Sequence, residues 1–320
     1  MKIEVKNLTF GYIKQPLLFS GVTFTIGNKN KVLLLGGCDS GKTTLLNLLC
    51  KMEDLYFGNI LYNGKNAKEM RFDEINTSLL LNPPVLYERK SVLDNILEMY
   101  YVKEEKTKEK RLSSKDKKLI KNAKTCEICE KIGCFLQNID PKCKISKLSN
   151  GQKISVSLLR SMLKESENVF IDDIEKVEDM NLLEQLVSGK TLLATSSTVK
   201  DFGIKFDNIL YLSFGKIYEY SSLEGMREKR IDLTCANMFD SLVKIDAKIT
   251  LEDVGYFLDF DDKKYKFGDD YFLKLKKLGL ELYDEAEVVF AFDESSEHLF
   301  DLIDKKSVSM YEKLTREKIF

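Results

Sequence analysis

This sequence of 320 residues has no apolar run long enough to cross a bilayer, no excess of charge of either sign and only one histidine. Because a membrane-spanning helix needs about 20 predominantly apolar residues, we expect no transmembrane segment. Lys and Arg total 50 against 51 Asp and Glu, so the chain has no overall field to hold nucleic acid or anionic lipid. The first residues, Met-Lys-Ile-Glu-Val-Lys, lack the apolar core of a signal peptide, which favours a cytoplasmic protein.

A disulfide framework is also missing, because the seven cysteines are odd in number and scattered over periodic segments. Cys126 and Cys129 form a CxxC that is followed by Cys134 and Cys143, so a structural zinc site is one interpretation. The surrounding pattern is helical, and cysteine in such a pattern usually packs as a small apolar residue. We favour this second interpretation.

What the sequence does contain is a regular succession of strand and helix patterns, with a hydrophobic share of 43% that supports an ordinary core. Residues 2–36 alternate apolar and polar positions and end in the apolar run 32–35. This pattern predicts antiparallel strands followed by one fully buried strand. A helix is expected over 42–52 and a short strand over 58–64.

The pattern turns helical over residues 91–135 and includes a strongly basic stretch. Residues 103–124 carry ten Lys or Arg and four Asp or Glu, with few apolar side chains. We weigh a phosphate-binding arm against a solvated helical face and favour the solvated face.

The rest of the chain predicts a parallel sheet and then a smaller β-rich domain. Helices and strands alternate at 151–164, 168–171, 179–187, 191–195, 209–212 and 216–220. This alternation argues for an α/β fold whose mostly parallel sheet is covered on both faces. Strand signals dominate from about residue 232, and residues 256–267 predict a hairpin with its turn at 261–264.

A phosphate-binding loop is predicted between the strand at 32–35 and the helix that follows it, the context that the P-loop pattern requires. Glycines let the backbone amides curl around phosphates, and the helix start adds unpaired N–H groups. Lys42 is expected to reach the terminal phosphates of a nucleotide and Thr43 to hold Mg²⁺. The loop comprises Gly36, Gly37, Cys38, Asp39, Ser40, Gly41, Lys42, Thr43 and Thr44.

Further segments, at matching spacings, resemble the ATPase of ABC transporters over residues 1 to about 222. The run Leu148-Ser149-Asn150-Gly151-Gln152 is similar to the family's LSGGQ signature and opens a helix, as in that family. Residues 169–173 resemble the Walker B strand and end in Asp172 and Asp173, and Asp179 falls on the D-loop aspartate. Residues 82–87 and 91–96 resemble the Q-loop and the start of the helical subdomain, which spans about 88–150.

The resemblance implies a subunit that binds ATP with Mg²⁺ and pairs head to tail with a second ATPase subunit, identical or different. Separate transmembrane permease subunits would dock on the helical subdomain, at the inner face of the cell membrane. Asp172, Thr43 and Asn82 would hold the metal, and Tyr12 would stack on adenine, although by itself it is an ordinary core or surface tyrosine. Ser149, Asn150, Gly151 and Gln152 would close over the nucleotide of the opposite subunit.

Several catalytic positions depart from the family. The glutamate that polarises the attacking water is Asp173, which retracts its carboxylate by about 1.5 Å, and a 1 Å misplacement can cost on the order of 100-fold in rate. The switch histidine is Ser196, which cannot sense the γ-phosphate by protonation. Asn82 replaces the Q-loop glutamine, Asn150 the first glycine of the signature, and Asp39 an internal P-loop glycine, where its charge would repel phosphate. We therefore expect ATP binding with slow hydrolysis.

Residues 215–220 and the β-rich segment after them resemble the regulatory C-terminal domain of sugar-importer ATPases of the maltose and multiple-sugar type. The best local match is 297–301, Glu-His-Leu-Phe-Asp, which follows a predicted strand at 287–292. The resemblance implies a regulatory domain at 232–320 and a role in carbohydrate import. A packing or capping role for His298 is the alternative.

Two other functions remain open at this point. A nucleotide-sensing subunit would bind ATP in a heterodimer without useful turnover, which the altered positions 173, 196 and 82 favour. A soluble ABC protein acting on ribosomes or DNA typically carries two ATPase domains or a long coiled coil, and the sequence shows neither pattern. We expect no nucleic-acid partner.

Overall fold

The computed structural model describes residues 1–54, 57–71, 74–108, 111–136, 139–228, 234–235, 238–239, 242–252, 255–260, 263–266, 285–293 and 298–301. The chain divides into two units, Met1–Ser221 and Ser222–Phe320. The boundary falls between the last strand of the first unit and the short helix α6 (Leu223–Glu228).

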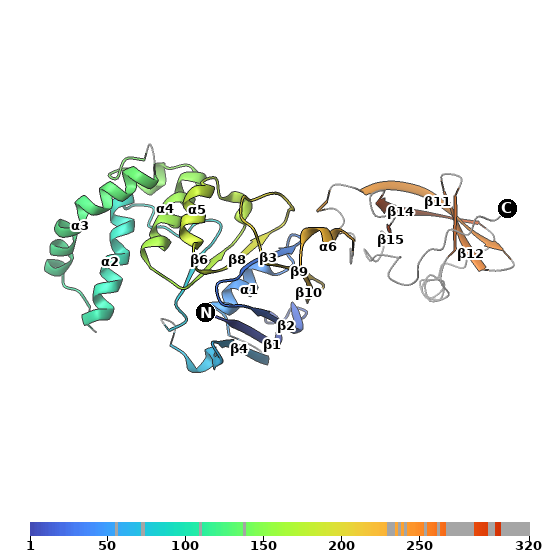
Figure 1. Ribbon diagram of the computed structural model, residues 1–320, viewed down its shortest axis with the longest axis horizontal. Coiled ribbons are helices and arrows are strands. Elements are labelled where there is room, and N and C mark those ends of the chain that lie inside the picture. The colour runs from blue at the N-terminus through green and yellow to red at the C-terminus, as the bar shows by residue number, and fades with distance from the viewer. Residues whose placement is uncertain are drawn as a thin grey trace. The chain divides into compact units, whose positions relative to one another are not determined.

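A six-stranded sheet forms the centre of the first unit (Figure 1). Its strands, in spatial order, are β10 (Lys216–Tyr220), β9 (Asn208–Ser213), β3 (Lys31–Gly36), β8 (Thr191–Ser196), β7 (Asn168–Ile171) and β6 (Thr77–Leu80). β3 pairs in parallel with β8 and β9, and β7 pairs in parallel with β6 and β8, whereas β10 is antiparallel to β9. The predicted α/β fold with a mostly parallel sheet is confirmed.

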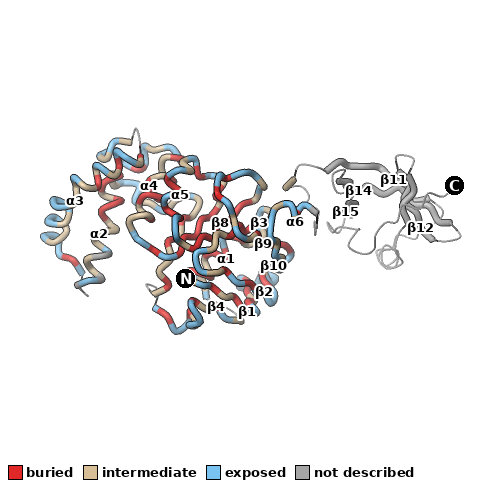
Figure 2. Tube along the Cα trace, viewed as in Figure 1, coloured by how far each residue is buried: buried red, intermediate tan, exposed pale blue. Residues whose placement is uncertain are grey.

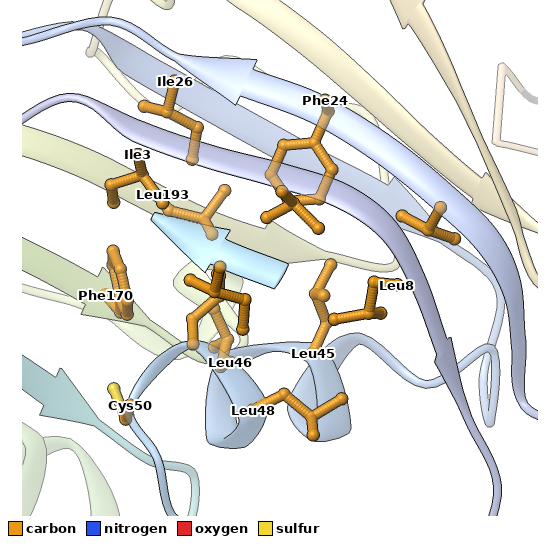
Figure 3. Close-up of a cluster of buried hydrophobic side chains, with 14 of the residues drawn as sticks. Ile3, Leu8, Phe24, Ile26, Leu45, Leu46, Leu48, Cys50, Phe170 and Leu193 are labelled. Atoms are coloured by element: carbon orange, nitrogen blue, oxygen red, sulfur yellow. The ribbon is translucent and has the colours of Figure 1, made fainter. Parts of the chain in front are cut away.

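A smaller antiparallel sheet has the strand order β2-β1-β4-β5, so the alternating pattern near the start of the chain is correctly interpreted. Its strands are β1 (Ile3–Phe10), β2 (Phe19–Ile26), β4 (Phe57–Tyr62) and β5 (Lys65–Asn66). Helix α1 (Lys42–Leu49) packs its leucines against both sheets, in one core with Phe24 and Leu193 (Figure 3). Each buried side chain of this size contributes about 1.5–3 kcal/mol, so the core holds the loop before α1 in a fixed place.

The remaining elements of the first unit are helical. They are α2 (Val92–Lys108), α3 (Ser114–Phe135), α4 (Asn150–Leu163), α5 (Met180–Val187) and the 3₁₀ turns η1 (Ala67–Glu69), η2 (Ile145–Lys147) and η3 (Ile174–Lys176). The pattern over 91–135 is two helices rather than one, because Ser113 and Asp116 form a capping box that starts α3. Among the described helices, none combines the length and apolar character needed to cross a bilayer.

The basic stretch lies on the end of α2 and on α3, where many residues are exposed (Figure 2). Lys115 and Lys118 are exposed, and Lys121 forms an ion pair with Asp94 at 2.6 Å. The solvated face that we favoured is therefore confirmed for the basic residues of α3, whereas the side chains of Lys103, Lys106, Lys108 and Lys110 lie outside the described part of the chain.

The cysteines of α3 are free, and Cys126 is exposed with its sulfur 3.7 Å from Glu130 Oε1. Apolar packing, the favoured interpretation of the CxxC, is therefore wrong for Cys126, because Ile128 and Ile132 are the buried positions of this helix and Cys126 lies off their stripe. No group of three or more His, Cys, Asp or Glu in the described part of the chain is placed to hold a metal ion.

The second unit contains a five-stranded antiparallel sheet with the order β13-β12-β11-β14-β15. These strands are β11 (Leu242–Glu252), β12 (Gly255–Phe260), β13 (Lys263–Lys266), β14 (Glu285–Asp293) and β15 (His298–Asp301). β12 and β13 are antiparallel neighbours, which confirms the predicted hairpin, although β13 begins within the predicted turn. The turn residues 261–262, residue 267 and Glu297 of the 297–301 motif lie outside the described residues. A regulatory role for this unit stays a prediction.

Candidate functional site

The carboxyl ends of four parallel strands bring the predicted catalytic segments to one edge of the central sheet. β3 leads into the loop 36–44, β7 into Asp172 and Asp173, β6 into the segment that contains Asn82, and β8 ends at Ser196. Because β3, β8, β7 and β6 are parallel neighbours, these ends lie side by side. This edge is where open α/β sheets bind ligands.

The loop between β3 and α1 has the backbone that close approach to phosphate requires. A Cβ atom on Gly36 would lie 2.6 Å from Ser40 Oγ and 2.9 Å from the Leu212 carbonyl oxygen, so only glycine fits there. Gly41 has a φ of 100° and caps the N-terminus of α1. Asp39 has a φ of 58°, in the left-handed region that aspartate tolerates better than most residues.

The Lys42 ammonium lies at the mouth of this loop. It donates to the carbonyl oxygens of Gly36 at 2.9 Å and Gly37 at 2.8 Å, and the side chain is buried. Burial lowers the pKa of Lys42 below its ordinary value, although Asp173 and other nearby negative groups act in the opposite direction. A phosphate chain in the loop would supply the negative charge that a buried ammonium requires.

Two hydroxyls hold the Asp172 carboxylate, which is buried at the end of β7. Thr43 donates to Asp172 Oδ2 at 2.8 Å, and Thr195 donates to Asp172 Oδ1 at 2.9 Å. Burial raises the pKa of Asp172, and the hydrogen bonds from these two threonines oppose that effect. Thr43 and Asp172 thus present a hydroxyl and a carboxylate oxygen side by side, the hard donors that Mg²⁺ prefers.

Asp173, the residue at the water-polarising position, is held from two sides. Its backbone N–H donates to Thr195 Oγ1 at 2.9 Å, and its side-chain Oδ2 accepts from Asn82 Nδ2 at 2.9 Å. The backbone of Asp173 has a φ of 53°. Asn82 therefore lies beside Asp173 and donates a hydrogen bond to one of its carboxylate oxygens.

Ser196 does not line the cavity beside the loop. It is fully buried, and its hydroxyl donates to the Thr198 carbonyl oxygen at 2.8 Å. The next residue, Ser197, lines the cavity beside the loop instead. Sequence reasoning picked the last residue of β8 and missed its neighbour, since the direction of each side chain depends on where the strand ends.

One cavity of about 670 Å³ collects most of these groups. Its lining comprises Tyr12, Gln15, Pro16, Leu17, Leu18, Cys38, Asp39, Ser40, Gly41, Lys42, Thr43, Thr44, Asp173, Glu175, Lys176 and Ser197. Of the predicted residues, the structure brings loop residues 38–44, Asp173 and Tyr12 to this lining, whereas Asn82, Asp172 and Ser196 are not part of it. Glu175, Lys176 and Ser197 were not predicted, although two carboxylates only two positions apart after a buried strand were a visible signal.

Tyr12 stands at the side of the cavity that is lined by residues 15–18. Its ring is 39% exposed and packs edge-on against Phe10, with centroids 5.0 Å apart. Its hydroxyl is 3.0 Å from Thr44 Oγ1, so the ring is fixed to the loop. An exposed, oriented aromatic beside a phosphate loop is suited to stack on a base.

The signature-like segment lies at a different place, at the start of α4. Ser149 and Gln152 form a capping box, with hydrogen bonds of 3.2 Å and 3.0 Å between them. Gly151 and Gln152 line a second cavity of about 340 Å³ together with Asp179. A Cβ atom on Gly151 would lie 2.2 Å from Glu178 Oε2, so that carboxylate lies directly on the signature glycine.

Comparison with known proteins agrees with this geometry. The ABC transporter family model matches residues 19–175. Heavy metal tolerance factor 1 of Caenorhabditis elegans is 28% identical over 226 residues, covering 68% of this chain and 27% of that protein. The ATP-dependent lipid A-core flippase of Haemophilus influenzae is 24% identical over 240 residues, covering 71% of this chain and 39% of the flippase.

A third relative is the mitochondrial iron-sulfur clusters transporter ATM1 of Kluyveromyces lactis, 26% identical over 204 residues, which cover 62% of this chain and 26% of the transporter. A solved structure, a bacterial Atm1-family ABC exporter with ATP bound, shares the fold with a TM-score of 0.55 and 19% identity, over 75% of this chain and 41% of the exporter. This chain thus spans between about a quarter and two fifths of these proteins.

None of the proteins named above is a sugar importer, so the predicted likeness to that subgroup is not supported. The family-level prediction is confirmed by the family match, by the relatives and by the P-loop fold. Residues 19–175 of this chain, just under half of its length, thus match the ABC transporter family model.

Proposed function

We propose that this chain is the ATP-binding part of an ABC transporter, which couples ATP binding and slow hydrolysis to movement of a substrate across a membrane. The observation that carries the proposal is the cavity in which the buried Lys42 ammonium faces the loop carbonyls of Gly36 and Gly37. The ammonium is poised to exchange these neutral partners for the phosphates of a nucleotide. Tyr12, on the same cavity, would stack on adenine.

Mg²⁺ would be held by Thr43 Oγ1 and Asp172 Oδ2, which are 2.8 Å apart. Asn82 is the third residue predicted to hold the metal. In the structure, its side-chain amide nitrogen donates a hydrogen bond to Asp173. When bound, the ion neutralises charge on the β- and γ-phosphate oxygens. Thr195 keeps the Asp172 carboxylate oriented by donating to its other oxygen.

The partners in this proposal are a second ATPase unit and membrane-spanning subunits or segments. Support comes from the separation of the signature segment and the loop, which line different cavities. A signature that serves the opposite subunit has no need to reach its own P-loop. Partnership with membrane-spanning subunits would keep the ATPase unit at the inner face of the membrane. Import of sugars is not part of the proposal, because no relative named above supports it.

Hydrolysis is proposed to be slow because the side chains at two of the altered positions, 173 and 196, are already engaged in hydrogen bonds within the protein. Asp173 gives one carboxylate oxygen to Asn82, and Ser196 gives its hydroxyl to a backbone carbonyl. These contacts also favour a second candidate, a nucleotide-sensing subunit without useful turnover. Measured ATP hydrolysis by the chain, alone and with a second ATPase unit, separates the two: no hydrolysis in either state, with ATP affinity retained, selects the sensor.

The direct test compares ATP binding by the wild-type chain and by Lys42→Ala, with Mg²⁺, using titration calorimetry. We expect Lys42→Ala to weaken binding by about 100-fold, because hydrogen bonds to charged groups contribute about 1.5–3 kcal/mol. Lys68→Ala, which removes an exposed lysine of η1, is the matched control and should bind ATP as the wild type does. Equal affinities for wild type and Lys42→Ala would refute the proposed function.

A further inference from the structure

Lys176 is a second cation on the lining of the nucleotide cavity. It is the last residue of η3, it is exposed, and it lines the same cavity as Lys42. The Lys42 ammonium already donates to the carbonyl oxygens of Gly36 and Gly37. The Lys176 ammonium, by contrast, has no hydrogen bond or ion pair with any residue that the structure describes. Its charge is therefore available to a ligand of this cavity.

The backbone that carries Lys176 is held in place. Its N–H donates to the Asp173 carbonyl oxygen at 2.9 Å. Ser197 donates to the side chain of the preceding residue, Glu175, through its N–H at 3.1 Å and its hydroxyl at 2.8 Å. Lys200 Nζ donates to the Glu175 carbonyl oxygen at 3.3 Å. These bonds fix η3 to the ends of β7 and β8, so the long side chain of Lys176 starts from a rigid base.

The part of the lining that contains Lys176 lies near the expected position of the terminal phosphates. Burial lowers the pKa of Lys42, and the charge of Asp173 is the largest of those that oppose this effect, so the Asp173 carboxylate lies close to the Lys42 ammonium. Lys176 follows Asp173 by three residues and is bonded to it through the backbone. A nucleotide with its base on Tyr12 and its phosphate chain extended to Lys42 therefore ends beside η3.

This lining has few positive charges for a ligand as negative as ATP. Its ionisable side chains are the carboxylates of Asp39, Asp173 and Glu175, the ammonium groups of Lys42 and Lys176, and the Cys38 thiol and Tyr12 phenol. The γ-phosphate adds negative charge that ADP lacks, and like charges on the lining repel it. A free ammonium at this end of the cavity offsets that repulsion and donates charge-assisted hydrogen bonds to phosphate oxygens.

We propose that Lys176 binds the γ-phosphate of the nucleotide held by its own chain, and so provides selectivity for ATP over ADP. The residue at the switch-histidine position, Ser196, is buried and donates to the Thr198 carbonyl oxygen, so it leaves this role unfilled. Lys176 fills it with a permanent charge rather than with a group that titrates near neutral pH.

This inference rests on the proposed function, and the experiment keeps the two apart. Binding of Mg²⁺-ATP and of Mg²⁺-ADP is measured by titration calorimetry at low salt on the full chain, for wild type, Lys176→Gln, Lys176→Arg, Lys205→Gln and Lys42→Ala. Lys205 is exposed between β8 and β9 and does not line the cavity, so Lys205→Gln is a matched loss of one positive charge. Because ADP lacks only the γ-phosphate, the comparison of the two nucleotides isolates the proposed contact.

We expect Lys176→Gln to weaken ATP binding by at least about fivefold, the effect of one charge pair about 4 Å apart in water. Its ADP affinity should change by less than about twofold, because screening weakens the attraction of the more distant phosphates. Lys176→Arg keeps the charge and should bind both nucleotides within about twofold of the wild type. Lys205→Gln should match the wild type for both.

Equal losses of ATP and ADP affinity in Lys176→Gln, or no loss of either, would overturn the proposal. Each titration is run at two chain concentrations. A loss that appears only at the higher concentration would also overturn it, since Lys176 would then contact the nucleotide of a second copy. Absence of ATP binding by the wild-type chain, or equal ATP affinities of wild type and Lys42→Ala, would instead refute the proposed function, and the role of Lys176 with it.

Discussion

Asp39 is the residue whose replacement should strengthen nucleotide binding. It occupies an internal position of the phosphate loop, is exposed on the cavity and has a φ of 58°. Two like charges 4 Å apart repel by about 1 kcal/mol in bulk water and by about 4 kcal/mol at a protein surface. Because Asp39 is exposed, the lower value applies, and about 1 kcal/mol corresponds to about fivefold in affinity.

Three substitutions separate the charge of Asp39 from its backbone conformation. Asp39→Asn removes only the charge, because asparagine tolerates the left-handed region as aspartate does. Asp39→Gly removes the charge and also fits a positive φ without steric cost. Asp39→Ala removes the charge but keeps a Cβ atom. Because alanine has no polar side chain to offset the cost of a positive φ, this variant should lower the free energy of unfolding by about 1 kcal/mol.

The assay is titration of each variant with Mg²⁺-ATP at low and at high ionic strength, with Asp54→Asn as the control for an exposed aspartate outside the cavity lining. Asp39→Asn and Asp39→Gly should each bind ATP about fivefold more tightly at low salt, and the gain should shrink near 1 M salt, where the screening length is about 3 Å. Unchanged affinity of Asp39→Asn at low salt would show that this carboxylate faces away from the phosphates, and the reasoning would fail.

Two further predictions concern stability. Thr195→Val removes the hydroxyl that donates to Asp172 Oδ1 and accepts from the backbone N–H of Asp173, so both groups lose that partner. This variant should lower the free energy of unfolding in urea by about 2–4 kcal/mol. Thr195→Ser keeps the hydroxyl and should lower it by under about 1 kcal/mol. Hydrogen bonds from Lys124 and Lys131 lower the pKa of Glu127 to about 2, so the stability from this cluster is present above pH 4.5 and is lost as the pH falls toward 2. Because the Glu127 side chain is 39% exposed and so screened by solvent, Glu127→Gln should reduce the fall in melting temperature between pH 5 and pH 3 by an amount equivalent to about 1 kcal/mol, and an unchanged pH dependence would contradict this.

The central sheet and the loop were predictable because both follow from local patterns. The apolar run 32–35 could form only a buried strand, and the glycines after it, followed by Lys42 and Thr43, fit one known arrangement. The hairpin of β12 and β13 followed from alternation and turn residues in the same way. In each case the decisive residues are neighbours in sequence, so their geometry needs no knowledge of distant contacts.

The missed features depend on contacts between distant residues. The Glu175 side chain accepts a hydrogen bond from Ser197, which lies 22 positions further along the chain. Neither residue can be recognised as part of the site from its sequence neighbours alone. The break between α2 and α3 was also missed, because the alternating charges around it continue a helical pattern while Ser113 and Asp116 start a new helix. The direction of Ser196 depends on the Thr198 carbonyl, which the strand pattern does not specify.

The site separates into groups that bind phosphate and groups that activate water, and the altered catalytic positions belong to the second kind. Phosphate binding relies on backbone amides of the loop and on Lys42, and these groups remain, since a backbone N–H is present whatever the side chain. Water activation relies on the exact reach of a carboxylate, and Asp173 has lost a methylene there and gained the contact with Asn82. Selection that maintains ATP binding alone would preserve the phosphate-binding groups and leave the water-activating groups free to change. Selection that maintains turnover would keep the carboxylate at position 173 free to contact water, and here its Oδ2 accepts a hydrogen bond from Asn82 at 2.9 Å. ATP hydrolysis by the wild-type chain, alone and with a second ATPase unit, therefore distinguishes a chain that senses ATP from one that consumes it.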